Sequence, residues 1–257
     1  MQLALLALFL VVAVLLVVRA ANRDKRDYRR FKKLRTTRER QFVFAKWLRE
    51  AFLIFGGLSI AVLMASWTFI DPAAASALSW PPLAWLKHVI GGDFGIGLGI
   101  GIAVAFVAVL VLPVILLRRH QGDVPMVGDV GSLLPRTRGE LKYGLGLSLN
   151  AGLMEEVLFR LGMPALLFGI TGNGVLSFVL ASVLFGMLHL YQKVLGVIAT
   201  FLLGLVFCLV YLLSGSIWVV IVAHALIDLR SLVLIPIVIG GVWRVSGDNT
   251  ERASSLK

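Results

Sequence analysis

Cysteine is nearly absent from this chain, since Cys208 is the only one among 257 residues. A single cysteine excludes an intrachain disulfide and a zinc cluster built from cysteines. Charge is also scarce: 15% of the residues are Asp, Glu, Lys or Arg, and 25 bases outnumber 14 acids. The chain is instead 59% hydrophobic, with a mean hydropathy of +0.92. Stacked membrane helices need that much apolar material, and a soluble core does not.

Seven apolar runs approach the ~20 residues that cross the hydrocarbon core of a bilayer. They cover residues 3–18, 51–70, 96–117, 143–168, 175–190, 194–213 and 217–239. The fifth run is the shortest of those in the second half of the chain. The sequence therefore predicts an all-α fold, a polytopic membrane helix bundle of about seven transmembrane helices.

Lysine and arginine are unevenly distributed, and their positions predict the orientation. Thirteen of the 25 lie between Arg19 and Arg49. Such a cluster can bind nucleic acid, but a cytoplasmic segment beside anionic lipid explains it without a further assumption. No base precedes the first run, unlike in a signal peptide, so we expect an uncleaved anchor. Because the outer loops would hold only Lys87, the positive-inside rule predicts an outside N-terminus and a cytoplasmic C-terminus, in the cell membrane.

Six ionisable side chains fall within three of the predicted spans. They are Glu155, Glu156, Arg160, His189, His224 and Asp228. Ionisable groups in hydrocarbon are costly, so they usually face a cavity and serve chemistry or transport. The sequence therefore predicts a functional site inside the membrane.

Helix geometry separates the two adjacent glutamates. Neighbours on a helix point about 100° apart, so Glu155 and Glu156 cannot aim at one spot. Glu156 shares a face with Arg160, and a buried ion pair there would lower the cost of both charges. Glu155 is then expected on a stripe with Ser148 and Gly152, whose small side chains would leave room for substrate or water. That setting suits a general base, although a purely structural charge cluster is the alternative.

The two histidines carry different signals. His224 and Asp228 are four residues apart on one face, so Asp228 could orient the imidazole, or both could point into one cavity. His189, alone at a helix end, has the pattern of a structural or interfacial histidine. The motifs H-E-x-x-H and G-x-S-x-G and the paired aspartates of intramembrane aspartyl proteases are all absent. The candidate chemistry is therefore attack by activated water.

Three motifs, in this order, resemble a known family. The sequence EEVLFR at 155–160 resembles the E-E-x-x-x-R motif of the CAAX-processing and bacteriocin-processing (CPBP) intramembrane proteases. FGMLH at 185–189 is similar to the F-x-x-x-H motif of that family, and HALID at 224–228 to its H-x-x-x-N/D motif. The resemblance covers roughly residues 134–236. The N-terminal third carries no signal of the family.

The resemblance implies a membrane endopeptidase with a site open toward the cytoplasm. It assigns Glu155 as the base that activates water and His189 as a residue that helps to hold the water. His224 and Asp228 would stabilise the oxyanion or bind a metal. The implied metal set is Glu155, His189, His224 and Asp228, with zinc as the divalent cation, and the resemblance leaves the need for a metal open.

Two further assignments come from the same resemblance. Glu156 and Arg160 would support the catalytic residues, and Arg160 could lie near a substrate carboxylate. Family members with Asn at the last motif position can donate a hydrogen bond to an oxyanion. Asp228 cannot do so when ionised, which favours metal ligation or orientation of the histidine.

This interpretation divides the chain into four parts. They are an anchor with a basic cytoplasmic segment (1–50), two transmembrane helices with loops (51–133), the CPBP-like helix core (134–240) and a cytoplasmic tail (241–257). The expected partners are membrane lipid and a peptide or protein substrate, and not nucleic acid. A transporter or an immunity-type binding protein on the same scaffold is the alternative, although the inverted repeats common in transporters are not visible.

The predicted depths of two site residues disagree. His189 falls at the cytoplasmic end of its span, whereas Glu155 lies about 12 residues into its own, or ~18 Å at 1.5 Å per residue. The disagreement shrinks if residues 143–147 lie at the membrane surface.

Overall fold

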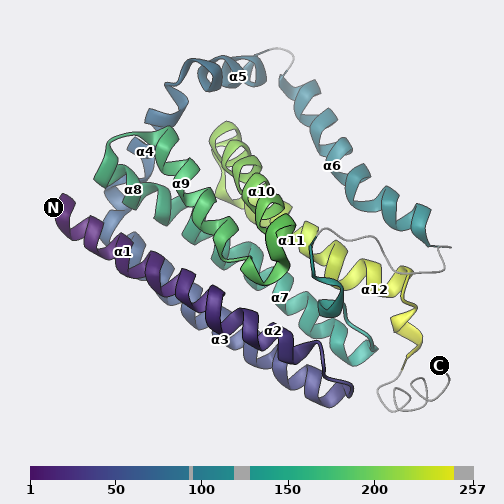
Figure 1. Ribbon diagram of the computed structural model, residues 1–257. Helices are drawn as coiled ribbons and strands as arrows, with labels where there is room; N and C mark the ends of the chain where they lie inside the picture. The colour runs from purple at the N-terminus through teal and green to yellow at the C-terminus, as the bar shows by residue number, and fades with distance from the viewer. Residues whose placement is uncertain (93–94, 119–127, 246–257) are drawn as a thin grey trace.

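The computed structural model describes residues 1–92, 95–118 and 128–245, and the regular structure within them is helical (Figure 1). The α-helices are α1 (Gln2–Val18), α2 (Lys25–Phe31), α3 (Thr37–Ser66), α4 (Ile70–Leu78), α5 (Pro81–Gly91), α6 (Gly95–Leu117), α7 (Arg138–Glu156), α8 (Met163–Thr171), α9 (Gly174–Met187), α10 (Lys193–Ser214), α11 (Ile217–Leu229) and α12 (Ile235–Val238). The predicted all-α class is confirmed. Most of the expected tail, and part of the expected loop after α6, lie outside the described residues.

Five helical stretches are long and apolar enough to cross a membrane. They are Gln2–Phe31, Thr37–Leu78, Gly97–Leu116, Leu190–Ser214 and Ile217–Val238. Helix α9 is apolar but shorter, and α7 with α8 is not among the five. The chain is thus a polytopic helical membrane protein, and the predicted number of seven spans is not confirmed.

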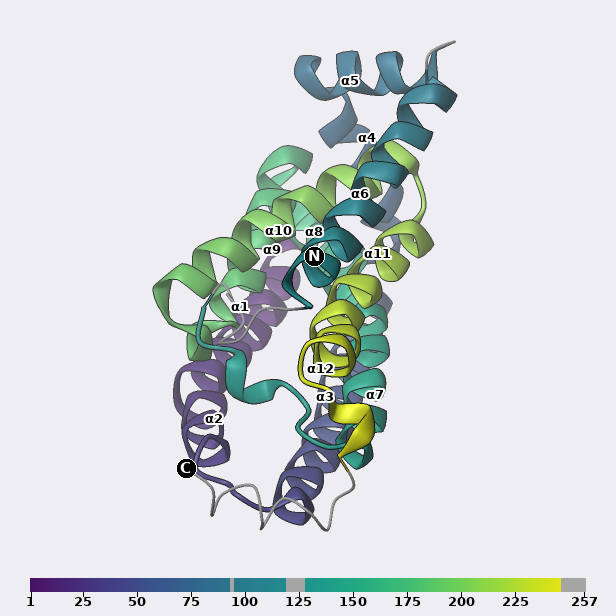
Figure 2. The same cartoon turned by 90° about the vertical axis from the view of Figure 1, so that its right-hand side faces the viewer.

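Helix α7 packs against both α3 and α11. Helix α9 packs against α8 and α10, and α1 packs against α8. Helix α5 crosses one end of the bundle, and α6 runs back from it beside α12 (Figure 2). Helix α6 otherwise stands apart from the bundle in Figure 1.

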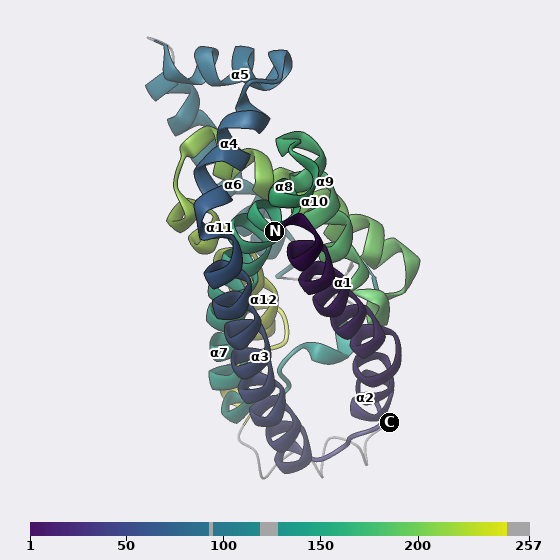
Figure 3. The same ribbon diagram turned by 90° about the vertical axis from the view of Figure 1, so that its left-hand side faces the viewer.

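The basic segment between the first two spans is helical. Helix α1 continues through a π-helical stretch, Arg19–Asp24, into α2. Thr36 then caps α3: its hydroxyl accepts a hydrogen bond from the Glu39 N–H, and the Glu39 side chain accepts one from the Thr36 N–H. This reciprocal cap is a strong helix start signal. Most of these basic residues therefore lie on two helical segments that run in opposite directions and are joined by a short turn (Figure 3).

One of these bases is a buried structural residue. Arg40 is 1% exposed and Glu140, at the start of α7, is 0% exposed. The Arg40 Nε lies 3.1 Å from both Glu140 carboxylate oxygens, and the guanidinium also donates to the carbonyl oxygens of Ser132 and Leu134 at 3.2 and 3.0 Å. Its carbon Cζ lies 4.4 Å from the ring centroid of Phe31. Arg40 thus joins the N-terminal helices to the loop before α7 and to α7 itself.

Glycines let α7 approach α11 closely. A Cβ on Gly152 would lie 2.9 Å from the Ala225 Cβ and from the Ile221 carbonyl oxygen. Ser148, one turn earlier, is 0% exposed. The expectation that Ser148 and Gly152 leave room for substrate is therefore wrong, because these small side chains allow close helix packing instead.

Replacing Arg40 by alanine should lower the free energy of unfolding by about 3 kcal/mol or more, because it leaves Glu140 buried without its partner. Thermal unfolding of the detergent-solubilised protein measures the change. Arg38→Ala is a matched control on the same helix, since Arg38 is exposed; it should cost about 0.5 kcal/mol or less. Equal unfolding of the two variants would contradict the structural role of Arg40.

Candidate active site

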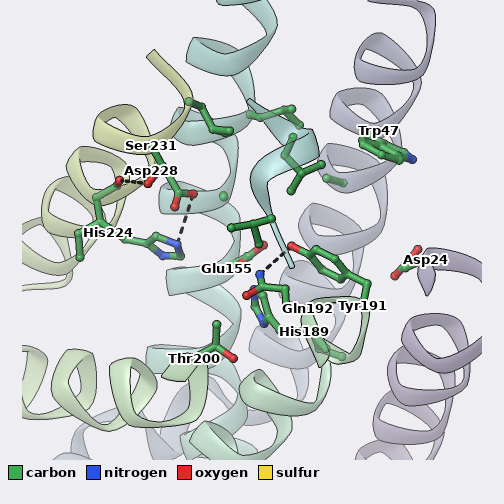
Figure 4. Close-up of a pocket in the computed structure, with 18 of the residues that line it drawn as sticks. Asp24, Trp47, Glu155, His189, Tyr191, Gln192, Thr200, His224, Asp228 and Ser231 are labelled. Atoms are coloured by element: carbon green, nitrogen blue, oxygen red, sulfur yellow. Dashed lines mark hydrogen bonds and ion pairs between the residues drawn. The ribbon is translucent and has the colours of Figure 1, made fainter. Parts of the chain in front are cut away.

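A cavity of about 620 Å³ lies between the N-terminal helices and the core of the bundle (Figure 4). Four of the six predicted site residues line it: Glu155, His189, His224 and Asp228. They come from α7, the turn after α9, and α11. The sequence predicted Glu155 and His189 at different depths in the membrane, yet both line this cavity.

Glu156 does not line the cavity, and its carboxylate contacts both Arg160 and His224. Its side chain is fully buried. One carboxylate oxygen lies 2.9 Å from the Nε of Arg160, as the helical spacing predicts, but the N–H does not point at it, so the contact is an ion pair and not a hydrogen bond. The other oxygen lies 2.6 Å from Nδ1 of His224, which donates to it. Because Nδ1 faces Glu156, the Nε2 of His224 is the nitrogen turned toward Asp228.

Arg160 is enclosed by aromatic rings. It is 1% exposed, and its Cζ lies 4.6 Å from the ring centroid of Phe185 and 5.3 Å from that of Phe207. Cations are attracted to the faces of such rings. Among the described residues its nitrogens have no hydrogen-bond partner. Arg160 does not line the cavity, so the arrangement gives it a supporting position beside Glu156.

Asp228 contributes less to the orientation of His224 than the sequence suggests. Its carboxylate lies 3.7 Å from Nε2 of His224, which is an ion-pair distance but too long for a hydrogen bond. The Asp228 side chain is 32% exposed, whereas that of His224 is 6% exposed. Glu156 therefore orients the ring, and Asp228 faces the cavity.

His189 is held by the backbone of its own helix end. Its Nδ1 lies 2.9 Å from the carbonyl oxygen of Phe185. In a neutral imidazole this assigns the proton to Nδ1, and leaves Nε2 as an acceptor. The His189 ring also packs at 5.0 Å from the ring of Phe185.

Two helices widen next to the site residues. One π-helical stretch, Val157–Gly162, begins directly after Glu156. A second one, Arg230–Leu234, begins two residues after Asp228. Each ends shortly before a proline, Pro164 or Pro236. Proline lacks an N–H and clashes with the carbonyl four residues earlier, and π-turns are frequent at functional sites.

Several residues that line the cavity belong to none of the three motifs and were not predicted from the sequence. They are Leu16, Arg19, Asp24, Tyr28, Trp47, Tyr191 and Gln192. Five of these belong to the N-terminal helices, which therefore form one wall of the cavity. Only the packing of distant segments brings them there.

No arrangement suited to a metal is present in the part of the chain that the structure describes. Within residues 1–92, 95–118 and 128–245, no group of three or more His, Cys, Asp or Glu side chains could hold a metal ion. The predicted zinc set of Glu155, His189, His224 and Asp228 is therefore not supported.

These features define a helical membrane protein in which acids and histidines from three segments line one internal cavity. Residues 137–230 match the family described as Type II CAAX prenyl endopeptidase Rce1-like. This stretch contains all three motifs, so the resemblance to the CPBP proteases is confirmed over these residues. Searches among curated proteins and among solved structures found no match.

The two adjacent glutamates should differ in their effect on stability. Glu156→Gln leaves Arg160 buried without a counter-charge and should cost about 3 kcal/mol or more. Glu155→Gln, which keeps the shape of a side chain that faces the cavity, should cost much less. Thermal unfolding in the same detergent compares the two variants. A larger loss for Glu155→Gln would contradict the placement of the two carboxylates.

Proposed function

We propose that this protein is an intramembrane endopeptidase that hydrolyses a peptide bond with activated water near the cytoplasmic face of the membrane. The main support is that one cavity is lined by Glu155, His189, His224 and Asp228. They do so within a segment that resembles a protease family over residues 137–230. A proton relay across the membrane would instead need these groups at successive depths.

Glu155 is the general base in this proposal. A water molecule donates one hydrogen bond to Nε2 of His189, the free acceptor left by the bond of Nδ1 to the Phe185 carbonyl. Its other proton passes to the Glu155 carboxylate as the oxygen attacks the scissile carbonyl carbon. Glu155 then returns the proton to the leaving amine, in the usual sequence of general base and general acid.

His224 stabilises the negative charge that develops on the carbonyl oxygen. With a carboxylate facing each ring nitrogen, the imidazole holds a proton on both. Glu156 fixes the ring through Nδ1, so the Nε2–H is held in one direction toward the cavity. A donor that is oriented before the reaction begins is worth more than one that must reorganise. The Asp228 carboxylate, 3.7 Å from Nε2, stabilises the positive charge of the His224 ring.

The distribution of bases supports a cavity that opens toward the cytoplasm. Helix α2, the start of α3 and the start of α7 lie at one end of the bundle, and α4 and α5 lie at the other (Figure 1). The first end holds the basic segment, and Lys87 lies on α5. The positive-inside rule then places the first end in the cytoplasm and the N-terminus of α1 outside.

The substrate class is a peptide segment of a membrane-associated protein. Part of the cavity wall is apolar, with Leu16, Phe44, Trp47 and Phe55 contributed by α1 and α3. Such a wall accepts an apolar side chain or a lipid chain equally well. Prenylation of the substrate, which the family description names, is therefore not required by the proposal.

Glu155→Gln should abolish cleavage while the protein still folds, because the amide keeps the shape of the side chain but cannot take a proton. Membranes from cells that express wild type or the variant would be compared for new peptide termini by mass spectrometry. Asp71→Asn is the matched control, since Asp71 is exposed on α4 and does not line the cavity. Termini that persist in the Glu155→Gln sample would refute the assigned base.

A further inference from the structure

The turn after α9 places more than a histidine in the cavity. Tyr191 and Gln192 lie two and three residues after His189, and all three side chains line the same cavity as Glu155. Figure 4 shows the Tyr191 hydroxyl directed toward the region of Glu155. None of the three sequence motifs includes Tyr191 or Gln192.

The Tyr191 hydroxyl is available as a hydrogen-bond donor. The Gln192 amide donates a hydrogen bond to the Tyr191 oxygen at 3.0 Å. A phenol can accept and also donate one hydrogen bond. Within the described residues no acceptor for the Tyr191 O–H is recorded, so its donor direction is left for a molecule in the cavity.

The turn that carries Tyr191 is held by residues that do not themselves line the cavity. The Gln192 carbonyl accepts a hydrogen bond from the Asp129 N–H at 3.2 Å. The Asp129 carboxylate lies 2.6 Å from Nζ of Lys32, the residue directly after α2, and 3.5 Å from Nζ of Lys193. The hydrogen bond from Lys32 keeps the pKa of Asp129 below its ordinary value. The carboxylate therefore stays ionised at neutral pH and joins α2 to the turn.

The backbone at the end of this turn is strained. Lys193 has φ 65° and ψ −178°, a conformation that residues other than glycine rarely adopt. Such strain costs of order 1–3 kcal/mol and persists where the surroundings impose it, often at active sites. The ring of Tyr28 adds an edge-to-face contact with Tyr191 at 5.3 Å between centroids. Tyr191 is thus held in one place before any substrate binds.

We propose that Tyr191 is a further catalytic residue, whose O–H donates a hydrogen bond to the carbonyl oxygen of the scissile peptide bond. Gln192 is a positioning residue that acts through the Tyr191 oxygen. The proposal rests on the proposed peptidase function. It adds a neutral donor, opposite His224 in Figure 4, to the charged one.

The step balances without another reactant. The water oxygen bonds to the carbonyl carbon, and the water proton passes to Glu155. The electron pair of the C=O double bond moves to the oxygen, whose negative charge accepts the hydrogen bond from Tyr191. When the C–N bond breaks, the nitrogen takes the proton from Glu155, and Tyr191 keeps its own proton throughout.

Tyr191→Phe removes the donor and keeps the ring. It should lower kcat by about 10²-fold, the usual effect of removing one oxyanion donor, with KM changed by no more than about twofold. The probe is a quenched fluorescent peptide that spans a cleavage site found in membranes. Tyr211→Phe is the matched control, because Tyr211 packs against Phe178 away from the cavity. A wild-type kcat for Tyr191→Phe would overturn the proposal.

A transition-state mimic separates this role from a structural one. The probe is an aldehyde of the same peptide, whose hydrate carries the tetrahedral oxygen. Tyr191→Phe should weaken its inhibition by about 10²-fold, in parallel with kcat. Unchanged inhibition, together with a shifted pH profile of kcat, would assign the hydroxyl to Glu155 instead and would also overturn the proposal.

Gln192→Ala tests the positioning role. It should lower kcat by about tenfold with Tyr191 present, and have no further effect on Tyr191→Phe, because residues that act through one group are not additive. An equal loss of kcat in wild type and in Tyr191→Phe would contradict the positioning role.

The role of Tyr191 and the peptidase function can fail separately. Cleavage by Glu155→Gln would refute the peptidase mechanism. An inactive Glu155→Gln together with a fully active Tyr191→Phe would refute only the role of Tyr191.

Discussion

The site depends on one buried carboxylate that contacts both an arginine and a histidine. Glu156 lies 2.9 Å from Arg160 and 2.6 Å from His224, and all three are almost inaccessible to solvent. In an apolar medium each of these groups alone would be very costly, so removing one leaves the others unsupported. The same contact joins α7 to α11 and fixes the ring of His224. Glu155, one residue earlier, is thereby left free to face the cavity.

Local geometry predicted much of this site from the sequence. The 100° between neighbours separated Glu155 from Glu156, and the spacing of four paired Glu156 with Arg160. The contact of Glu156 with His224 joins residues 68 apart, and no local pattern indicates it. The small residues Ser148 and Gly152 were assigned to open space, because a sequence does not show whether a helix or a cavity lies opposite. Tyr191 lies in a turn without periodicity.

The all-α class followed from composition, but the exact spans did not. Five helical stretches meet the criteria for crossing a membrane, and α7 with α8 does not. The π-helical stretches before Pro164 and Pro236 were also not predicted. The two prolines could have indicated them, because a proline disturbs the helical turn that precedes it. Arg40 was counted with the lipid-facing bases. Its burial depends on Glu140, a hundred residues away.

The N-terminal wall of the cavity has a consequence for how this protein could diverge. The groups assigned to bond cleavage lie within residues 137–230, whereas much of the opposite wall comes from α1 to α3, outside the family match. The wall is attached through Arg40 with Glu140 and through Lys32 with Asp129. Under the proposed function, substitutions among the wall residues of α1 to α3 would change which substrates the cavity admits without replacing the groups assigned to bond cleavage. If the proposed function holds, substrate selectivity and bond cleavage depend on separate stretches of the chain, which can evolve at different rates.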